Sequence, residues 1–220
     1  MTHLRTLIFD LDGTLIHSAP DLQAAVNVAL AAIDRGPLDL PTIVSFIGNG
    51  VEKLVERSLQ QTGGTSDDQF RETMALFMQS YTQNMTTLTR PYPGVIPFLE
   101  TLHGTDVRLG ICTNKPTRSA IAICDQLELT RFFDVIAGAE PDQPKKPDPA
   151  PLLNCIKALE GTSAHALYIG DSVVDYETAV NANVSFRLFI GGYLNSALPH
   201  LPAKDRFDDW VTNGIFEISD

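Results

Sequence analysis

The chain has 220 residues, of which 44% are hydrophobic and 20% are charged. This composition is typical of a folded globular protein and unlike that of disordered chains. The length suits one domain, or a core domain with a modest insertion. A net charge of -11 makes nucleic acid a poor partner, because phosphate backbones attract basic surfaces. An anionic phosphoester would also be repelled unless local cations, such as a bound metal and lysines, overcome the overall charge.

The three cysteines, Cys112, Cys124 and Cys155, are odd in number and form no Cys-x-x-Cys pair. Neither a disulfide framework nor a zinc site is indicated, and we expect buried thiols in a reducing cytoplasm. The apolar stretch near the N-terminus is short and interrupted by Asp10 and Asp12. It therefore predicts neither a signal peptide nor a membrane span, and no membrane partner is expected.

An apolar run from Leu4 to Phe9 predicts a buried parallel strand, and Asp10 and Asp12 follow where it should end. Strand periodicity places both carboxylates on one side, and Gly13 allows a sharp turn. Close carboxylates need a shared proton or a metal cation between them. Taken alone, the stretch is equally well interpreted as a strand followed by an ordinary Asp-Gly turn.

Residues 15–89 have a helical pattern with no convincing strand. The first helix opens at Ser18 with the form of a capping box, in which Asp21 is the second member. Further helices are expected from Val51 and from Asp67, and the glycine-flanked turn Gly48-Asn49-Gly50 precedes the first of these. The last helix carries a stripe of large apolar side chains that indicates core packing. Its members are Phe70, Met74, Phe77, Met78, Tyr81 and Met85.

From Arg90 onward the pattern alternates between helices and strands. Strands are expected at 107–112, 135–137, 166–169 and 184–190, and helices at 95–102, 118–127, 149–159 and 176–182. This alternation predicts an α/β fold with a three-layer parallel sheet, into which an all-helical domain is inserted. The catalytic core would comprise residues 1–14 and 90–220, and the helical cap residues 15–89. In the tail, a short helix is expected at 205–210 and an edge strand is possible at 215–218.

Three later polar clusters each follow an apolar run: Thr113-Asn114-Lys115, Lys145-Lys146-Pro147, and Gly170-Asp171-Ser172 with Asp175. The hydroxyl and backbone amides of the first cluster could hold a phosphoryl oxygen, or simply cap a helix. Asp171 and Asp175 would lie about one turn apart at the start of a helix. They suit either an ordinary acidic helix start or, together with Asp10 and Asp12, a site for a hard cation such as Mg²⁺.

The four clusters, in this order, resemble those of the haloacid dehalogenase superfamily of phosphohydrolases, and over nearly its whole length the chain is similar to the phosphoglycolate phosphatase family. The resemblance implies a Rossmann-like core with strand order 5-4-1-2-3 and a helical cap inserted after the first strand. It also implies a Mg²⁺-dependent phosphatase that acts on 2-phosphoglycolate, or on a similar small phosphorylated metabolite, through an aspartyl-phosphate intermediate.

The resemblance also implies the roles of individual residues. Asp10 would be the nucleophile, and Asp12 the general acid and base. A neighbouring carboxylate and partial burial would help to keep Asp12 protonated when substrate binds. Asp10, the backbone oxygen of Asp12, and Asp171 would hold Mg²⁺. Asp175 would orient a lysine or a metal-bound water, and Lys146, which directly precedes a proline, would balance the charge of Asp10 and the phosphoryl group.

Thr113 and Asn114 are expected to bind the phosphoryl group, whereas Lys115 is expected to face solvent or anchor the loop. Lys145 is expected to be solvated. In the cap, Gly48, Asn49 and Gly50 resemble the family's substrate-binding turn, whose free amides suit a carboxylate or phosphate, although a plain turn is the alternative.

Two residues depart from the family pattern. His17 replaces an acid that is common shortly after Thr14, which would make the local charge sensitive to pH unless the histidine is simply exposed. Asn183 replaces a glycine at a helix end, and Asn tolerates the left-handed conformation required there.

Four other functions fit parts of the pattern. A sugar-phosphate mutase similar to β-phosphoglucomutase shares the fold, but such mutases carry an acid where this chain has Gly170. A broad-range nucleotidase or pyrophosphatase shares the core motifs. A phospho-accepting signalling domain pairs similar residues but lacks a helical insertion, and an inactive binding protein would not need all four clusters.

Overall fold

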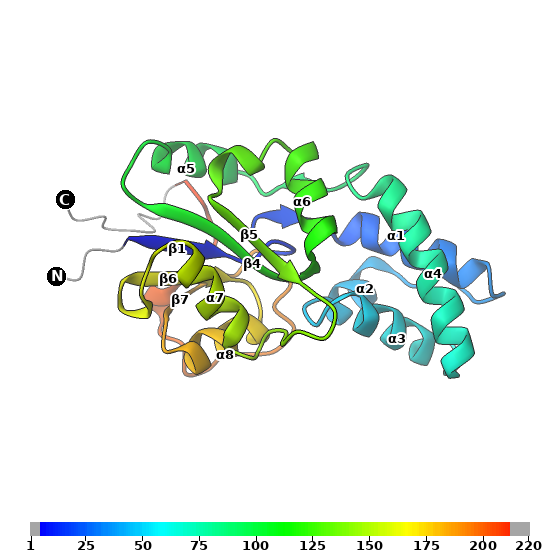
Figure 1. The fold of residues 1–220 in the computed structure, drawn as a ribbon. Helices are drawn as coiled ribbons and strands as arrows, with labels where there is room; N and C mark the ends of the chain where they lie inside the picture. Colours follow the sequence, from blue (N-terminus) through cyan, green and yellow to red (C-terminus); the bar gives the residue numbers. More distant parts are fainter. Residues whose placement is uncertain (1–4, 212–220) are drawn as a thin grey trace.

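The computed structural model describes residues 5–211 and is built around a six-stranded parallel sheet with the order β5-β4-β1-β6-β7-β8 (Figure 1). Its strands are β1 (Thr6–Phe9), β4 (Arg108–Pro116), β5 (Val135–Ala139), β6 (Ala166–Gly170), β7 (Ser185–Phe189) and β8 (Arg206–Phe207). Strand β1 lies in the interior and pairs in parallel with both β4 and β6. If β1, β4, β5, β6 and β7 are numbered 1 to 5 as the strands of the core, their order read from β7 is 5-4-1-2-3, which confirms the expected order. Strand β8 extends the sheet beyond β7.

Helices cover both faces of the sheet, as a three-layer α/β fold requires. Helices α5 (Val95–Leu102) and α6 (Thr117–Gln126) lie on one side, and α7 (Ala150–Ala158) and α8 (Val173–Ala182) lie on the other (Figure 1). Two short 3₁₀ turns, η1 (Thr130–Phe132) and η2 (Ser163–His165), precede β5 and β6. No helix within residues 5–211 combines the length and apolarity needed to cross a lipid bilayer.

The inserted segment forms four helices that pack on one another at one end of the molecule, to the right in Figure 1. They are α1 (Ala19–Ala31), α2 (Leu40–Phe46), α3 (Val51–Gln61) and α4 (Asp67–Asn84). The chain leaves and re-enters the core through β2 (Ile16–His17) and β3 (Arg90–Pro91), which pair antiparallel. Strand β2 is a short exception to the strand-free pattern expected for residues 15–89, and it places the two connections side by side.

One apolar cluster extends from the sheet into these helices, because Leu7 and Phe9 of β1 belong to the same buried group as Leu54 of α3 and Tyr81 of α4. Of the predicted stripe, Phe77, Tyr81 and Met85 are buried, and the other three members pack partly buried against the same cluster. The core interpretation of this stripe is therefore confirmed.

The predicted helix at 205–210 is wrong. A 3₁₀ turn, η3 (Ala203–Asp205), leads into β8, where Phe207 pairs with Phe189 of β7. The Phe207 and Trp210 rings meet edge to face at 5.0 Å, and both are buried. Packing against the sheet thus overrides the local helical pattern. The possible strand at 215–218 lies outside the described residues.

The two predicted helix ends differ in outcome. Asn183 ends α8 in the left-handed conformation, with φ of 52°, as expected. The capping box at Ser18 and Asp21 is wrong, because the Ser18 side chain does not cap α1 among the described residues. Asp21 instead accepts hydrogen bonds from the backbone of Leu88 and Thr89. The Tyr193 hydroxyl takes over the capping, since it accepts from the N–H groups of Ser18 and Ala19 at 2.9 Å each.

Candidate active site

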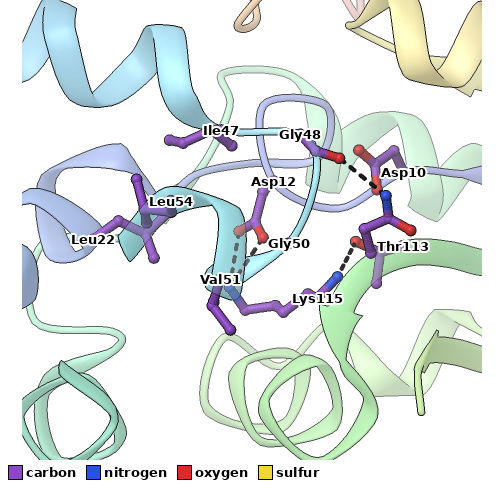
Figure 2. A pocket seen from close by; sticks show the side chains of 11 residues that line it. Asp10, Asp12, Leu22, Ile47, Gly48, Gly50, Val51, Leu54, Thr113 and Lys115 are labelled. Carbon is purple, nitrogen blue, oxygen red and sulfur yellow. Dashed lines mark hydrogen bonds and ion pairs between the residues drawn. The ribbon is translucent and has the colours of Figure 1, made fainter. Parts of the chain in front are cut away.

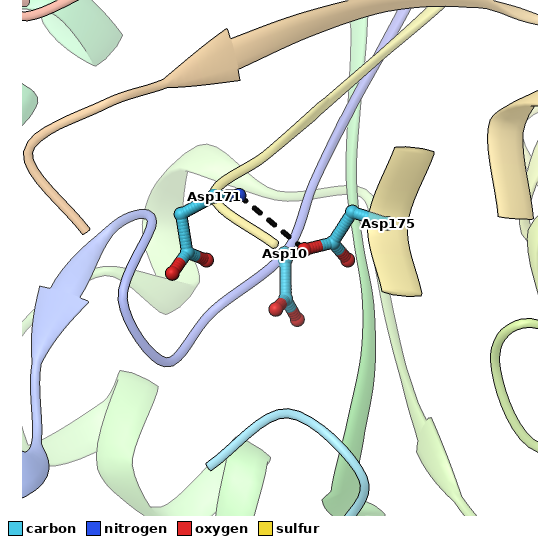
Figure 3. A group of neighbouring side chains, drawn as sticks. All are labelled: Asp10, Asp171 and Asp175. Carbon is cyan, nitrogen blue, oxygen red and sulfur yellow. Dashed lines mark hydrogen bonds between the residues drawn. The ribbon is translucent and has the colours of Figure 1, made fainter. Parts of the chain in front are cut away.

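Three buried aspartates meet at the carboxyl ends of β1 and β6 (Figure 3). Asp10 follows β1, Asp171 follows β6, and Asp175 comes from the first turn of α8. Because β1 and β6 are parallel neighbours, the residues after them are brought together. One carboxylate oxygen from each aspartate lies within 4.8 Å of the others. The sequence predicted Asp171 and Asp175 at a helix start and a cation site together with Asp10 and Asp12, and the structure brings three of these four carboxylates together.

The turn after Asp12 closes tightly around Asp171. Gly13 has φ of +87°, and a Cβ there would lie 2.3 Å from Asp171 Oδ2. Thr14 Oγ1 donates to Asp171 Oδ1 at 2.7 Å, and the backbone N–H of Tyr193 donates to Oδ2 at 2.6 Å. The loop from β1 and the segment after β7 thus hold this carboxylate from two sides.

Asp175 is saturated by hydrogen bonds and holds Lys146 in place. Ser172 caps α8 in a full capping box with Asp175, whose Oδ2 accepts from the Ser172 N–H and hydroxyl. Its Oδ1 accepts from Lys146 Nζ at 2.6 Å and from the Tyr168 hydroxyl at 2.8 Å. Burial alone would raise the pKa of Asp175, but Lys146 and these hydrogen bonds lower it below its usual value. Lys146 Nζ also lies 2.9 Å from Asp10 Oδ1, so it bridges the two aspartates.

The other two aspartates of the cluster, Asp10 and Asp171, have too little positive charge beside them to offset the cost of burying their ionised forms. Burial raises the pKa of Asp10 to about 6, despite the opposing effect of Lys146. Burial also raises the pKa of Asp171 well above its usual value, and the charges of Asp175 and Asp10 add to this effect. Apart from its ion pair with Lys146, Asp10 Oδ1 has no hydrogen-bond partner within the described part of the chain. These groups fit a cation bound by oxygen ligands.

A charge count supports the same conclusion. Four aspartates and two lysines meet at this site, and their formal charges sum to -2. A divalent cation would neutralise this charge, and carboxylate oxygens are ligands that Mg²⁺ prefers.

Asp12 forms an ion pair with Lys115 (Figure 2). Lys115 Nζ lies 3.1 and 3.0 Å from the two Asp12 carboxylate oxygens, and it donates to the Tyr81 hydroxyl of α4 at 2.6 Å. Lys115 is buried, with 3% of its surface exposed, so of the two expected positions the solvent-facing one is wrong and the loop anchor agrees with these contacts. The reason is that β4 continues to Pro116, with an irregular register after Cys112, instead of ending at Cys112.

This ion pair also changes the interpretation of Asp12. The sequence suggested a second carboxylate as the neighbour that keeps Asp12 protonated, but its observed partner is an ammonium group. The Asp12 carboxylate is outside the aspartate cluster. The expected metal contact of Asp12 concerns its backbone oxygen and stays a prediction.

Asn114 ties three segments together. Its Nδ2 donates to the backbone oxygens of Gly48 and Lys146, both at 3.0 Å, and its Oδ1 accepts from the Lys146 N–H at 2.9 Å. Both protons of the amide are therefore used in this arrangement. Neighbouring Thr113 is buried, and its hydroxyl oxygen accepts from the Lys115 N–H at 3.3 Å.

Within the expected substrate-binding turn, the two glycines line a cavity and the asparagine does not. Gly48 and Gly50 line a cavity beside Asp10 and Asp12, whereas Asn49 is not among its lining residues. Asn49 Oδ1 accepts from Arg57 Nη2 at 2.8 Å, which indicates that Asn49 stabilises the turn. Lys145 is partly exposed but is not simply solvated, because it pairs with Glu52 at 3.2 Å.

The cavity is small, about 30 Å³, which is room for roughly two water molecules. Figure 2 shows how polar groups from the sheet face apolar side chains from the helices across it. The apolar wall consists of Leu22, Ile47, Val51 and Leu54. This combination suits a small, partly polar ligand more than a bulky one.

Three tyrosines at this site have no local sequence signal. Tyr81 accepts from Lys115, the Tyr168 hydroxyl accepts from Lys146 at 2.8 Å, and Tyr193 contacts Asp171 and α1. Each lies in a pattern that also describes ordinary core packing. The only available indication was that a buried tyrosine hydroxyl needs a partner.

The comparison with known proteins agrees with this site. Residues 7–189 match the model of the haloacid dehalogenase-like hydrolases. The chain belongs to this family. Phosphoglycolate phosphatase from Cereibacter sphaeroides is 43% identical over 202 residues, which cover 91% of this chain and 92% of that protein. Phosphoglycolate phosphatase 1 from Pseudomonas aeruginosa is 38% identical over 192 residues, which cover 86% and 70%.

Solved structures of haloacid dehalogenase-like hydrolases share the fold as well. The crystal structure of a predicted phosphoglycolate phosphatase from Haemophilus somnus matches with a TM-score of 0.87 and 28% identity, covering 96% of each chain. The family resemblance inferred from the four polar clusters is thereby confirmed.

Proposed function

We propose that this haloacid dehalogenase-like hydrolase is a Mg²⁺-dependent phosphatase that hydrolyses 2-phosphoglycolate or a similar small phosphate monoester. The observation that carries the proposal is the group of three buried aspartates within 4.8 Å of one another, beside Lys146. The relatives named phosphoglycolate phosphatase support the choice of substrate.

In the first step, a carboxylate oxygen of Asp10 attacks phosphorus, and the bond between phosphorus and the leaving oxygen breaks. Asp12 donates a proton to that oxygen, so that an alcohol leaves and an aspartyl-phosphate remains. Lys146 and the Thr113 hydroxyl would neutralise and position the phosphoryl oxygens.

In the second step, Asp12 accepts a proton from water, whose oxygen attacks phosphorus. The bond to Asp10 breaks, and inorganic phosphate forms. Asp10, Asp171 and the backbone oxygen of Asp12 would hold Mg²⁺, which supplies charge neutralisation for the phosphoryl group. Asp175 keeps Lys146 in position through the 2.6 Å hydrogen bond between them.

We assign substrate selection to residues 15–89 as a cap, and the chemistry to residues 1–14 and 90–220 as the core. The side-by-side connections β2 and β3 support this division. Gly48 and Gly50 would bring backbone amides to the leaving group, while Asn49 supports the turn. A cytoplasmic location is supported by the three buried, unpaired cysteines.

The decisive experiment measures phosphate release from 2-phosphoglycolate, β-glucose 1-phosphate, a nucleoside monophosphate and pyrophosphate, each with Mg²⁺ and with excess chelator. We expect kcat/KM for 2-phosphoglycolate to exceed the others by at least ~10²-fold, a transition-state preference of ~2.7 kcal/mol. The chelator should abolish release from every substrate.

The variant Asp10→Asn is the control for contaminating phosphatases, because it removes the nucleophile and should reduce release to the background level. Equal rates across the panel would leave a Mg²⁺ phosphatase with a different substrate. Metal-independent release, or none from any ester, would contradict the proposal.

A specific contact argues against the mutase alternative. A Cβ at Gly170 would lie 2.4 Å from the Cβ and Cγ atoms of Asp175. An acidic side chain at this position would therefore displace the residue that holds Lys146.

A further inference from the structure

We propose that Lys115 recognises the carboxylate of the leaving group, exchanging its contact with the Asp12 carboxylate for one with the substrate. The inference rests on the proposed phosphatase function and names a specificity-determining residue for it.

The first argument is the distribution of charge around the cavity. Among the described residues that line it, Lys115 is the only basic one, and the others are two aspartates, polar uncharged groups and apolar side chains. A carboxylate buried here without a cation would be strongly unfavourable. Lys146 is already engaged by Asp10, Asp175 and the Tyr168 hydroxyl, and it does not line the cavity.

The second argument is position. Lys115 Nζ touches both carboxylate oxygens of Asp12, at 3.1 and 3.0 Å. In 2-phosphoglycolate, a single carbon atom separates the carboxylate from the ester oxygen. When the ester oxygen lies beside Asp12, the carboxylate of the same leaving group therefore lies within reach of Lys115, which contacts Asp12.

Tyr81 provides the fixed support that such an exchange needs. Lys115 Nζ donates to its hydroxyl at 2.6 Å, and the Tyr81 ring is stacked on Phe77 in the core. Burial raises the pKa of Tyr81 to about 12, so the hydroxyl stays neutral and accepts from the ammonium group. Lys115 thus remains at the cavity wall when its bonds to Asp12 are exchanged.

The experiment compares 2-phosphoglycolate with 2-hydroxyethyl phosphate, in which a hydroxymethyl group replaces the carboxylate. Steady-state kcat and KM are measured with Mg²⁺ at neutral pH for the wild-type protein, Lys115→Met and Lys157→Met. Lys157 lies exposed on α7 and controls for the loss of a lysine charge. Removing a buried partner of a charged group should cost Lys115→Met ~10²-fold in kcat/KM for 2-phosphoglycolate. The change for 2-hydroxyethyl phosphate should stay within about threefold.

A Lys115→Met variant that keeps the wild-type preference, or that loses the same factor on both substrates, would show that Lys115 has only a structural role. A wild-type protein that hydrolyses both esters with Mg²⁺ but without preference would overturn this inference and leave the phosphatase activity, whereas release from neither ester would contradict the proposed function. Circular dichroism checks the fold. Should Lys115→Met not fold, Lys115→Gln, which retains a donor for Tyr81, is judged by the same ratio of substrates.

Discussion

At the residue scale, Gly13 shows how closely the backbone approaches the proposed metal ligand Asp171. Its positive φ of +87° disfavours any other residue, and a Cβ would meet Asp171 Oδ2 at 2.3 Å. Gly104 offers a matched comparison, since it has φ of +86° and a Cβ there would have no neighbour within 4 Å among the described residues.

We therefore expect Gly104→Ala to lower the free energy of unfolding by about 1–2 kcal/mol through backbone strain alone. Gly13→Ala should cost at least ~1 kcal/mol more, because it adds a clash in a packed site. Urea denaturation measures both values, and Mg²⁺ titration should show weakened binding only for Gly13→Ala. If the two variants lose the same stability and Gly13→Ala binds Mg²⁺ as the wild-type protein does, the loop that carries Asp171 can shift to accommodate the added methyl group.

The raised pKa values of Asp10 and Asp171 predict that protons compete with Mg²⁺. Both carboxylates must be ionised to bind the cation, and the pKa of Asp10 is about 6. Lowering the pH from 7.5 to 5.5 should weaken Mg²⁺ binding by roughly tenfold or more. Isothermal titration calorimetry without substrate measures this, with Asp10→Asn as the variant whose dependence should be shallower. An affinity that is constant over this range would contradict the assignment of these two ligands.

At the scale of elements, the N-terminus of α1 is capped by a tyrosine from a distant part of the chain. Its sequence supplied a plausible capping box, but Asp21 is used by Leu88 and Thr89, and the Tyr193 hydroxyl accepts from Ser18 and Ala19 instead. Local pattern located the helix correctly, whereas a contact across 175 residues decides how it is capped.

Tyr193→Phe should lower the free energy of unfolding by about 1–3 kcal/mol, because it leaves backbone N–H groups without their acceptor in a buried place. Tyr176→Phe is the matched control, since that ring packs edge-on against Phe186 at the outer helix α8, and it should change stability by less than ~0.5 kcal/mol. Thermal or urea denaturation compares the two, and similar values would show that water replaces the hydroxyl readily.

The elements that could be predicted are those with a strong pattern of their own. Helix α5 has the bounds expected from its sequence, and the aspartates of the site were found because they follow apolar strands. The partners of Asp12, Lys115 and Tyr81 could not be predicted, because Asp12 and Lys115 are 103 residues apart and β4 runs further than its apolar run. Side-chain direction at an irregular strand end depends on the assembled neighbours.

At the scale of the whole molecule, the site is expected to reduce stability in the absence of metal. Asp171 is 1% exposed, and its ionised form is disfavoured by burial and by its acidic neighbours. Asp171→Asn keeps the shape and can still pair with the Tyr193 N–H and the Thr14 hydroxyl. We expect it to raise the metal-free stability by ~1 kcal/mol, or about 2–4 °C in Tm.

The same variant should lose most of the stabilisation that Mg²⁺ gives the wild-type protein, together with phosphatase activity. Differential scanning calorimetry with and without Mg²⁺ at neutral pH tests both effects. A less stable Asp171→Asn protein in chelator would show that the hydrogen bonds of Asp171 outweigh its unfavourable charge.

The bond from Asn114 to the Gly48 carbonyl has a further consequence for how the cavity is filled. Gly48 and Asn114 both line the cavity, so an outward movement of the turn at Gly48 breaks this bond. The bond itself contributes only about 1 kcal/mol net. Where it breaks, an amide proton of Asn114 becomes available to an incoming anion. A phosphoryl group that arrives there would then meet one more hydrogen-bond donor than the ligand-free cavity presents.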